Sequence, residues 1–222
     1  MLSFFKDYKI FAIVFGIISI IIIAIIYNTL NVYQPLPIYQ PTMVSTELVD
    51  STIQHKKKYH KIAPFSLTNQ NGKTITQNNY KDKIYVADFF FTTCQTICPI
   101  MTTNMVKIQN ETLNDKDVML LSHSVTPEID SVAQLKRYAI KKGVNDKKWN
   151  LVTGSKKDIY KLARKSYLAV KDLGDGGPFD MIHTENFMLI DKKRQIRGFY
   201  DGTNLEDIDR LLEDIKILKE EK

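Results

Sequence analysis

The sequence predicts an α/β domain that follows a single apolar N-terminal helix. From about residue 61, short apolar strands alternate with helical stretches, a pattern typical of βαβ units and a largely parallel sheet. The chain has 222 residues, of which 44% are hydrophobic and 25% charged, and this suits one globular domain plus an extension. The net charge of +6 is spread along the whole chain, so nucleic-acid binding is not indicated.

Residues 10–27 carry no charge and are almost wholly apolar. As a helix with about 1.5 Å of rise per residue, they are long enough to cross a bilayer core of roughly 30 Å. Lys6 and Lys9 precede the stretch and no basic residue follows it before Lys56, so the positive-inside rule places residues 1–9 in the cytoplasm. We therefore expect a single-pass protein whose remaining chain lies on the outer face of the membrane.

A cleaved signal peptide is the alternative for this apolar stretch. Small residues at a plausible cleavage site are missing after Ala24, so the sequence favours an uncleaved anchor. Asp7 and the lack of an arginine-rich leader favour the inner membrane of a bacterium, with the domain on its periplasmic side, over a mitochondrial membrane. Such a compartment permits disulfides.

Residues 28–60 contain three prolines, a run of three lysines and little periodicity. This composition predicts a spacer that holds a domain at 61–222 away from the bilayer. His55 and His60 fall in the solvated approach to the first strand, and we do not expect them to bind metal.

The domain is predicted to open with a β-hairpin, because residues 65–67 and 73–76 flank the turn signal Asn71-Gly72. Apolar runs predict the remaining strands at 84–91, 118–125, 151–153, 186–190 and 195–200.

Helix start signals follow two of these strands. Thr126 as N-cap and Pro127 at the first helical position predict a helix that runs to about Lys142. Ser155 is expected to cap a second helix at 156–166.

The last predicted helix begins at a capping box formed by Thr203 and Glu206. An apolar stripe along one face predicts core packing and consists of Leu205, Ile208, Leu211, Leu212, Ile215 and Leu218.

Both cysteines of the chain lie in the stretch 84–105, where an apolar strand runs into a helix. Pro99 follows Cys94 and Cys98 and suits a first helical turn, so the cysteines are predicted at a helix N-terminus. Residues four apart share a helix face, and the helix N-terminus lowers the pKa of a thiol. The pair is expected to form a reversible disulfide or to hold a soft metal ion, because a purely structural disulfide would close too short a loop to stabilise much.

Residues 171–180 contain three glycines and a proline and lead to His183, directly before the predicted strand 186–190. A strand, a cysteine-bearing helix, another strand, a crossover and a closing hairpin plus helix form the thioredoxin-like arrangement, here with an N-terminal hairpin as an extension. In that arrangement the residues before the closing hairpin lie against the cysteine-bearing turn. His183 is therefore expected beside Cys94 and Cys98.

Three blocks of the sequence resemble the signature blocks of the Sco/SenC family, which consists of membrane-anchored copper chaperones of cytochrome c oxidase assembly. The blocks are DFFFTTCQTICPIMTTNM at 88–105, SVTPEIDSVAQLKRYA at 124–139 and HTENFMLIDKKRQIRGFYDG at 183–202. The resemblance covers about residues 62–218 together with the N-terminal anchor.

This resemblance implies that Cys94, Cys98 and His183 are copper ligands. Asp88 matches an acidic residue that the family has before its cysteine pair. One departure is visible at Thr126, where the family often has aspartate, and it puts a role of that position in partner contact in doubt.

The chemistry of these side chains also favours copper. Two thiolates suit the soft ion Cu(I), and an added imidazole supplies the harder nitrogen that Cu(II) prefers. Zinc is the competing metal, but three ligands on a mobile loop make a poor structural zinc site.

Three further side chains are expected near the site without binding the metal directly. Asp88 lies in an apolar run, where a carboxylate is costly unless it is hydrogen-bonded or tuned to the thiols. Asp180 is a candidate to orient His183, and His123 is expected to be structural with a reserve role as a ligand.

Two classes of function follow. The first is a copper chaperone that receives Cu(I) or Cu(II) from an upstream donor and delivers it to the dinuclear copper centre of cytochrome c oxidase subunit II. The second is a thiol-disulfide reductase that acts on the cysteines of that centre or of another envelope protein, with Cys94 as nucleophile and a thiol reductant as partner. A thiol peroxidase is a weaker third possibility.

Overall fold

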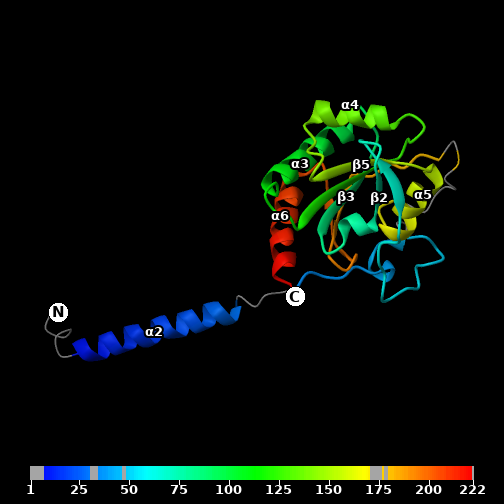
Figure 1. Cartoon of the computed structure of the whole chain (residues 1–222). Coiled ribbons are helices and arrows are strands. Elements are labelled where there is room, and N and C mark those ends of the chain that lie inside the picture. The colour runs from blue at the N-terminus through cyan, green and yellow to red at the C-terminus, as the bar shows by residue number, and fades with distance from the viewer. Residues whose placement is uncertain (1–7, 31–34, 47–48, 171–176, 178–179, 222) are drawn as a thin grey trace. The chain divides into compact units, whose positions relative to one another are not determined.

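The chain divides into two units, Met1–Pro35 and Leu36–Lys222. The computed structural model describes residues 8–30, 35–46, 49–170, 177 and 180–221. The first unit consists of helix α2 (Lys9–Leu30), drawn in blue in Figure 1. Its stretch Lys9–Ile26 is long and apolar enough to cross a membrane, a property that signal sequences share. The helix contains the predicted span and fits a membrane anchor.

The second unit is built on a sheet that has seven strands in the described residues. The strands are β1 (Ser66–Asn69), β2 (Thr74–Thr76), β3 (Ile84–Phe90), β4 (Val118–Ser124), β5 (Trp149–Thr153), β6 (Asn186–Ile190) and β7 (Ile196–Asp201). Their order across the sheet is β2-β1-β5-β4-β3-β6-β7. Each predicted strand is present, with its ends shifted by at most a few residues.

The sheet is mixed. Strands β3, β4 and β5 run parallel, whereas β1 and β2 on one side and β6 and β7 on the other pair antiparallel with their neighbours. The prediction of a largely parallel sheet is therefore wrong at both edges. The two predicted hairpins account for the antiparallel pairs β1–β2 and β6–β7. The pairs β1–β5 and β3–β6, which join these hairpins to the parallel strands, are antiparallel as well.

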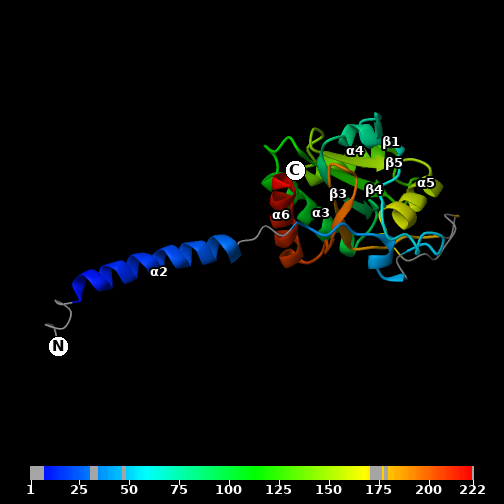
Figure 2. The same ribbon diagram turned by 90° about the horizontal axis from the view of Figure 1, so that it is seen from below.

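Helices cover both faces of the sheet. They are α3 (Ile97–Glu111), α4 (Val132–Lys142), α5 (Lys156–Lys161), which continues as a π-helical segment (Leu162–Ser166), and α6 (Leu205–Glu220). Apolar side chains of α3, α4 and α6 form one core with the sheet, and those of α5 form a second core on the other face. Figures 1 and 2 show α3 and α6 on one side of the sheet and α5 on the other.

Strand β3 lies inside the sheet, between β4 and β6, and is buried along its whole length. Its side chains alternate between the two cores, so that Val86 and Phe90 face α3 while Ala87 and Phe89 face α5. Because β3 and β4 are parallel and in register, their carboxyl ends meet at the same edge of the sheet. The cysteine-bearing turn starts from that edge.

Helix α4 begins later than predicted. Its N-cap is Ser131, whose side chain accepts a hydrogen bond from the N–H of Gln134. Thr126 instead heads a single turn, in which its carbonyl accepts the N–H groups of Ile129 and Asp130. The Thr126 hydroxyl donates to the Asp130 carboxylate at 3.1 Å, so it is not free to cap a helix.

Helix α6 also starts one residue later than the predicted capping box. Asn204 is the N-cap, and its side chain accepts the N–H of Glu206. The Thr203 hydroxyl donates to Asp201 instead. Leu205 is 58% exposed and does not belong to the core stripe, which the other predicted residues form with Leu212 only partly buried. Ser155 caps α5 as predicted.

The compact unit begins at Leu36, and thus well before the predicted residue 61. The buried Arg197 guanidinium donates to the carbonyls of Leu36 and Pro37, at 2.6 and 3.1 Å. The imidazole of His60 is buried and hydrogen-bonds the carbonyl of Ser166 at 2.7 Å, so His60 does not lie in a solvated approach. Residues of the predicted spacer therefore contribute to the domain, because the Arg197 side chain and the Ser166 carbonyl, both far along the chain, bind them.

Candidate metal centre

The turn between β3 and α3 carries both cysteines. The N–H of Cys94 donates to the carbonyl of Phe91 at 3.3 Å, which bends the chain directly after the strand. Helix α3 then starts at Ile97, so Cys98 and Pro99 lie in its first turn as predicted, whereas Cys94 lies in the turn that precedes it. The helix thus begins at Ile97, three residues after Cys94 and one residue before Cys98.

The two thiols are in direct contact. The N–H of Cys98 donates to Cys94 Sγ at 3.4 Å, so the Cys94 sulfur satisfies one of the free N–H groups at the start of α3. Burial by itself raises the pKa of Cys94, but hydrogen bonds from the thiol and N–H of Cys98 and from Thr96 outweigh it and lower the pKa to about 7. Burial raises the pKa of Cys98 to about 12, and the neighbouring Cys94 and Asp88 add to this rise.

The two cysteines therefore differ in reactivity. Cys94 is half-buried and about half ionised at pH 7, whereas Cys98 is only 3% exposed and holds its proton. We expect iodoacetamide to alkylate Cys94 first, at a rate that rises with pH around a midpoint of about 7. Mass spectrometry of the reduced chain after timed quenching measures this profile. A midpoint at the ordinary thiol value of about 8.5 contradicts it.

Phe91 connects the cysteine turn to His183. Its carbonyl accepts the N–H of Cys94, and its own N–H donates to the Cys98 thiol. The Phe91 ring contacts the imidazole of His183 edge to face, with 5.8 Å between ring centroids. His183 is exposed and lies in the segment that leads into β6. The histidine is thus close to the turn but reaches it through an aromatic ring.

The structure brings Cys94 and Cys98 together but does not complete a three-ligand site. Among the described residues, no group of three His, Cys, Asp or Glu side chains is placed to hold a metal ion. The predicted loop 171–180 lies largely outside the described residues. At its end the carboxylate of Asp180 forms a buried bidentate ion pair with Arg164, with both N···O distances 2.7 Å. Asp180 therefore holds the end of this loop against the π-helical segment.

Asp88 lies on the face of the sheet that carries α3 and is 3% exposed. It accepts a hydrogen bond from the Ser122 hydroxyl, which in turn accepts the indole N–H of Trp149 at 2.8 Å. Its Oδ1 atom has no partner among the described residues. Burial raises the pKa of Asp88 to about 7, so this carboxyl group takes up and releases a proton near neutral pH next to Cys98.

His123 faces the opposite side of the sheet. Its ring stacks on Phe89 at 4.8 Å and meets Tyr167 edge to face at 5.1 Å, in the core that α5 covers. Its Nδ1 atom hydrogen-bonds the carbonyl of Asp88 at 3.2 Å, and burial lowers the pKa of His123 to about 4. This position agrees with the structural role and gives no support to the reserve role as a ligand.

Two residues near the thiols were missed by the sequence analysis. The Thr102 hydroxyl donates to the carbonyl of Cys98 at 2.7 Å and also hydrogen-bonds the Tyr138 hydroxyl at 2.7 Å. Thr102 follows Cys98 by four residues on the same helix face, which is a detectable signal. Tyr138 lies on α4, and no local pattern connects it to the cysteines.

Comparison with solved structures shows that the fold of this chain is similar to that of Sco proteins. The chain is 36% identical to a SCO1/SenC family lipoprotein of Bacillus anthracis str. Ames, with a TM-score of 0.65 over 72% of this chain and 96% of that one. It is 31% identical to BsSco, described as a member of the Sco family of cytochrome c oxidase assembly proteins with a disulfide switch, with a TM-score of 0.63 over 73% and 95%.

A third structure was solved with copper bound. It is ScoI of Arabidopsis thaliana, which is 26% identical, with a TM-score of 0.56 over 69% of this chain and 97% of that one. The predicted thioredoxin-like fold is confirmed, because the Sco structures share it. The SCO1/SenC family profile matches residues 53–220, which is more than half of the sequence. The chain therefore belongs to the SCO1/SenC family, whose members include copper-binding proteins of cytochrome c oxidase assembly.

Proposed function

We propose that this protein is a membrane-anchored copper chaperone. It binds copper through Cys94, Cys98 and His183 and delivers it to the dinuclear copper centre of cytochrome c oxidase subunit II. The observation that supports this most directly is the hydrogen bond from the N–H of Cys98, whose thiol is buried, to the ionisable thiol of Cys94, with an exposed imidazole one aromatic ring away. Membership of a family with copper-bound members agrees with it.

The residues present fit copper as a cargo. Two thiolates suit Cu(I), and the imidazole adds the nitrogen that Cu(II) prefers. Cys98 has to lose a proton when it binds the metal, because burial holds its pKa at about 12. We assign Asp88 the role of accepting that proton, since its pKa near 7 and its influence on Cys98 suit such a transfer.

The His183 segment is the part that has to move for all three ligands to meet. One of its ends is held by the Asp180–Arg164 ion pair and the other by β6, which is paired with both β3 and β7. Between these ends the described residues from Met181 to Glu185 form neither helix nor strand, but the N–H of Ile182 donates to the Tyr160 hydroxyl at 3.4 Å and the Thr184 hydroxyl donates to the carbonyl of Ala169 at 2.9 Å. Bringing the imidazole past Phe91 and towards the thiols therefore requires a displacement of His183 between these two contacts.

The start of the domain and the cysteine turn lie at opposite ends of β3. The N–H of Leu36, where the domain begins, donates to the Glu221 carboxylate, and its carbonyl accepts the guanidinium of Arg197 near the start of β7. The start of β7 pairs with the end of β6, and this end of β6 pairs with the start of β3. The cysteines follow the other end of β3. Within α2, the stretch Lys9–Ile26 is long and apolar enough to cross a membrane. We therefore assign anchoring to α2, in a bacterial inner membrane with the domain on the periplasmic side.

Substitution of His183 by alanine tests the ligand set. We expect the native chain to bind about one Cu(II) with sulfur and nitrogen ligation, and His183→Ala to lose the nitrogen signal and weaken binding at least tenfold. Metal analysis, thiolate-to-copper absorption and electron paramagnetic resonance measure these changes. His55→Ala is the matched control, because His55 is exposed and lies outside the site.

The second candidate function is thiol-disulfide reduction of the partner's cysteines. It is favoured by the pairing of an accessible thiol of pKa about 7 with a buried thiol that can resolve a mixed disulfide. If His183→Ala binds copper as well as the native chain and both reduce disulfides equally, the reductase becomes the primary function. The upstream copper donor is a partner in the first proposal and the thiol reductant is a partner in the second.

A further inference from the structure

A small groove beside Cys94 is lined by basic side chains. Its volume is about 300 Å³, and its lining consists of Thr92, Cys94, Pro99, Gln134, Arg137, Tyr138, Lys141 and Lys142. Three of these residues are basic and none is acidic. The positive charges come from one face of α4, while Cys94 and Pro99 come from the turn and helix start described above.

Hydrogen bonds hold this basic face in a defined position relative to the thiols. One chain of hydrogen bonds leads from Arg137 to Thr92. The Arg137 guanidinium donates to the side-chain oxygen of Gln134 at 2.7 Å, and the Gln134 amide donates to the Thr92 hydroxyl at 3.0 Å. Thr92 directly precedes the cysteine turn and is itself fixed by the buried carboxylate of Asp130. The arginine is therefore coupled to the turn rather than swinging freely in solvent.

A second path starts at the other cysteine. The carbonyl of Cys98 accepts the Thr102 hydroxyl, and Thr102 hydrogen-bonds the hydroxyl of Tyr138. The ammonium group of Lys142 lies over the Tyr138 ring, 5.8 Å from its centroid. Both ends of the groove are thus connected to the cysteine pair through short chains of polar contacts.

We propose that this groove recognises acidic side chains next to the cysteines of the partner protein. A positive groove beside a reactive thiol attracts carboxylates, speeds up encounter and orients the partner's sulfur towards Cys94. Ile100, which follows the lining residue Pro99 in the chain, is exposed. The inference rests on the proposed function, because it assumes that Cys94 meets a cysteine-bearing partner.

The test uses two synthetic peptides that differ only in charge. Each carries one cysteine activated as a thiopyridyl disulfide, flanked by glutamates in one peptide and by glutamines in the other. The Cys94 thiolate attacks the peptide sulfur, the bond to thiopyridine breaks, and the released thiopyridone is followed by its absorbance. The activated peptide is the oxidant and the reduced full-length chain, kept in neutral detergent, is the reductant.

We expect the glutamate peptide to react about tenfold faster than the glutamine peptide at low ionic strength. The ratio approaches one at about 0.5 M salt, where the Debye length falls to about 4 Å. The triple variant Arg137→Gln, Lys141→Gln and Lys142→Gln is expected to lose the preference. These side chains are exposed or half-buried, so the variant keeps its core.

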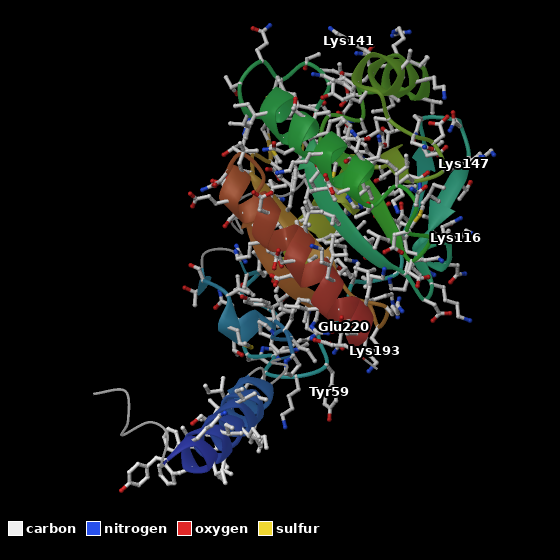
Figure 3. The ribbon with its side chains drawn as sticks, turned by 90° about the vertical axis from the view of Figure 1, so that its left-hand side faces the viewer. Tyr59, Lys116, Lys141, Lys147, Lys193 and Glu220 are labelled. Carbon is white, nitrogen blue, oxygen red and sulfur yellow. The ribbon has the colours of Figure 1, made fainter. Side chains whose placement is uncertain are left out.

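A matched control removes the same number of charges elsewhere. Lys116, Lys192 and Lys193 lie in loops that precede β4 and join β6 to β7, and Figure 3 shows Lys116 and Lys193 away from Lys141. Their substitution by glutamine is expected to leave the preference intact. An absent preference in the native chain, or equal losses in both triple variants, overturns the proposal. Copper stoichiometry of the groove variant is measured in parallel, so a failed chaperone function is recognised separately.

Discussion

Replacement of either cysteine by serine is expected to lower Cu(I) binding from about one ion per chain to near zero. A hydroxyl is a hard, neutral donor, whereas Cu(I) selects soft thiolates. The loss should be complete for Cys98→Ser as well as for Cys94→Ser, because one remaining thiolate and an exposed imidazole do not hold Cu(I) against a competing chelator. Titration of the reduced chain with Cu(I) in the presence of a colorimetric chelator measures this change.

Gln95→Ala is the control for this pair of variants, because Gln95 is exposed and lies between the two cysteines. It is expected to bind copper like the native chain. Native-like Cu(I) affinity in either serine variant would remove the cysteine pair from the ligand set.

Substitution of Asp88 by asparagine is expected to stabilise the domain above pH 7. Burial raises the pKa of Asp88 from its ordinary value of 3.8 to about 7, so between these values the folded chain keeps a proton that the unfolded chain releases. Stability is therefore lost as the pH rises from about 4 to 7, and the loss is complete above pH 7. The difference between the two pKa values corresponds to a loss of about 4 kcal/mol in the free energy of unfolding above pH 7. Asparagine avoids this loss because it does not ionise.

Urea unfolding between pH 4 and pH 8 measures this difference. Trp149 is the single tryptophan, it is buried, and it lies one hydrogen bond from the Ser122 hydroxyl that contacts Asp88, so its fluorescence reports unfolding at this place. The free energy of unfolding of Asp88→Asn minus that of the native chain should rise with pH and level off above pH 7. A difference that is constant over this range contradicts the assignment.

Asp130 provides a control with the opposite sign. It is fully buried like Asp88, but its carboxylate accepts hydrogen bonds from Thr92, Ser124 and Thr126. An asparagine there replaces one accepting oxygen by a donor that faces other donors, so Asp130→Asn is expected to destabilise the domain. The two buried carboxylates thus differ because Asp130 accepts several hydrogen bonds, whereas one oxygen of Asp88 has no partner in the part of the chain that the structure describes.

Local signals predicted most secondary structure and failed where side chains had more distant partners. The Asn71-Gly72 hairpin and the Ser155 cap depend on neighbours in the sequence, and the structure confirms both. Thr126 carries an equally good capping signal, but its hydroxyl binds Asp130 and the helix starts at Ser131. Capping motifs report what a side chain is able to bind, whereas tertiary contacts decide which partner it has.

The same distinction applies to the site. The spacing of Cys94 and Cys98 before Pro99 was sufficient to predict a thiol pair at the start of a helix, since Cys98 and Pro99 lie in the first turn of α3 and Cys94 lies in the turn directly before it. The resemblance of three sequence blocks pointed to His183 and to copper. Neither the spacing nor the resemblance indicated the different pKa values of the thiols, because these arise from burial and from hydrogen bonds that form only in the folded turn.

The sequence by itself determined the order of strands and helices, the apolar N-terminal helix and the chemistry of the cysteine pair, because these depend on residue type and short spacing. Only the tertiary structure decided the mixed sheet, the start of the domain at Leu36 and the basic groove of α4 beside Cys94. It also placed His123 on the face opposite α3 and left Asp88 with an unpartnered oxygen among the described residues. These features depend on which distant segments come into contact, and contact between distant segments is set by packing of the whole core.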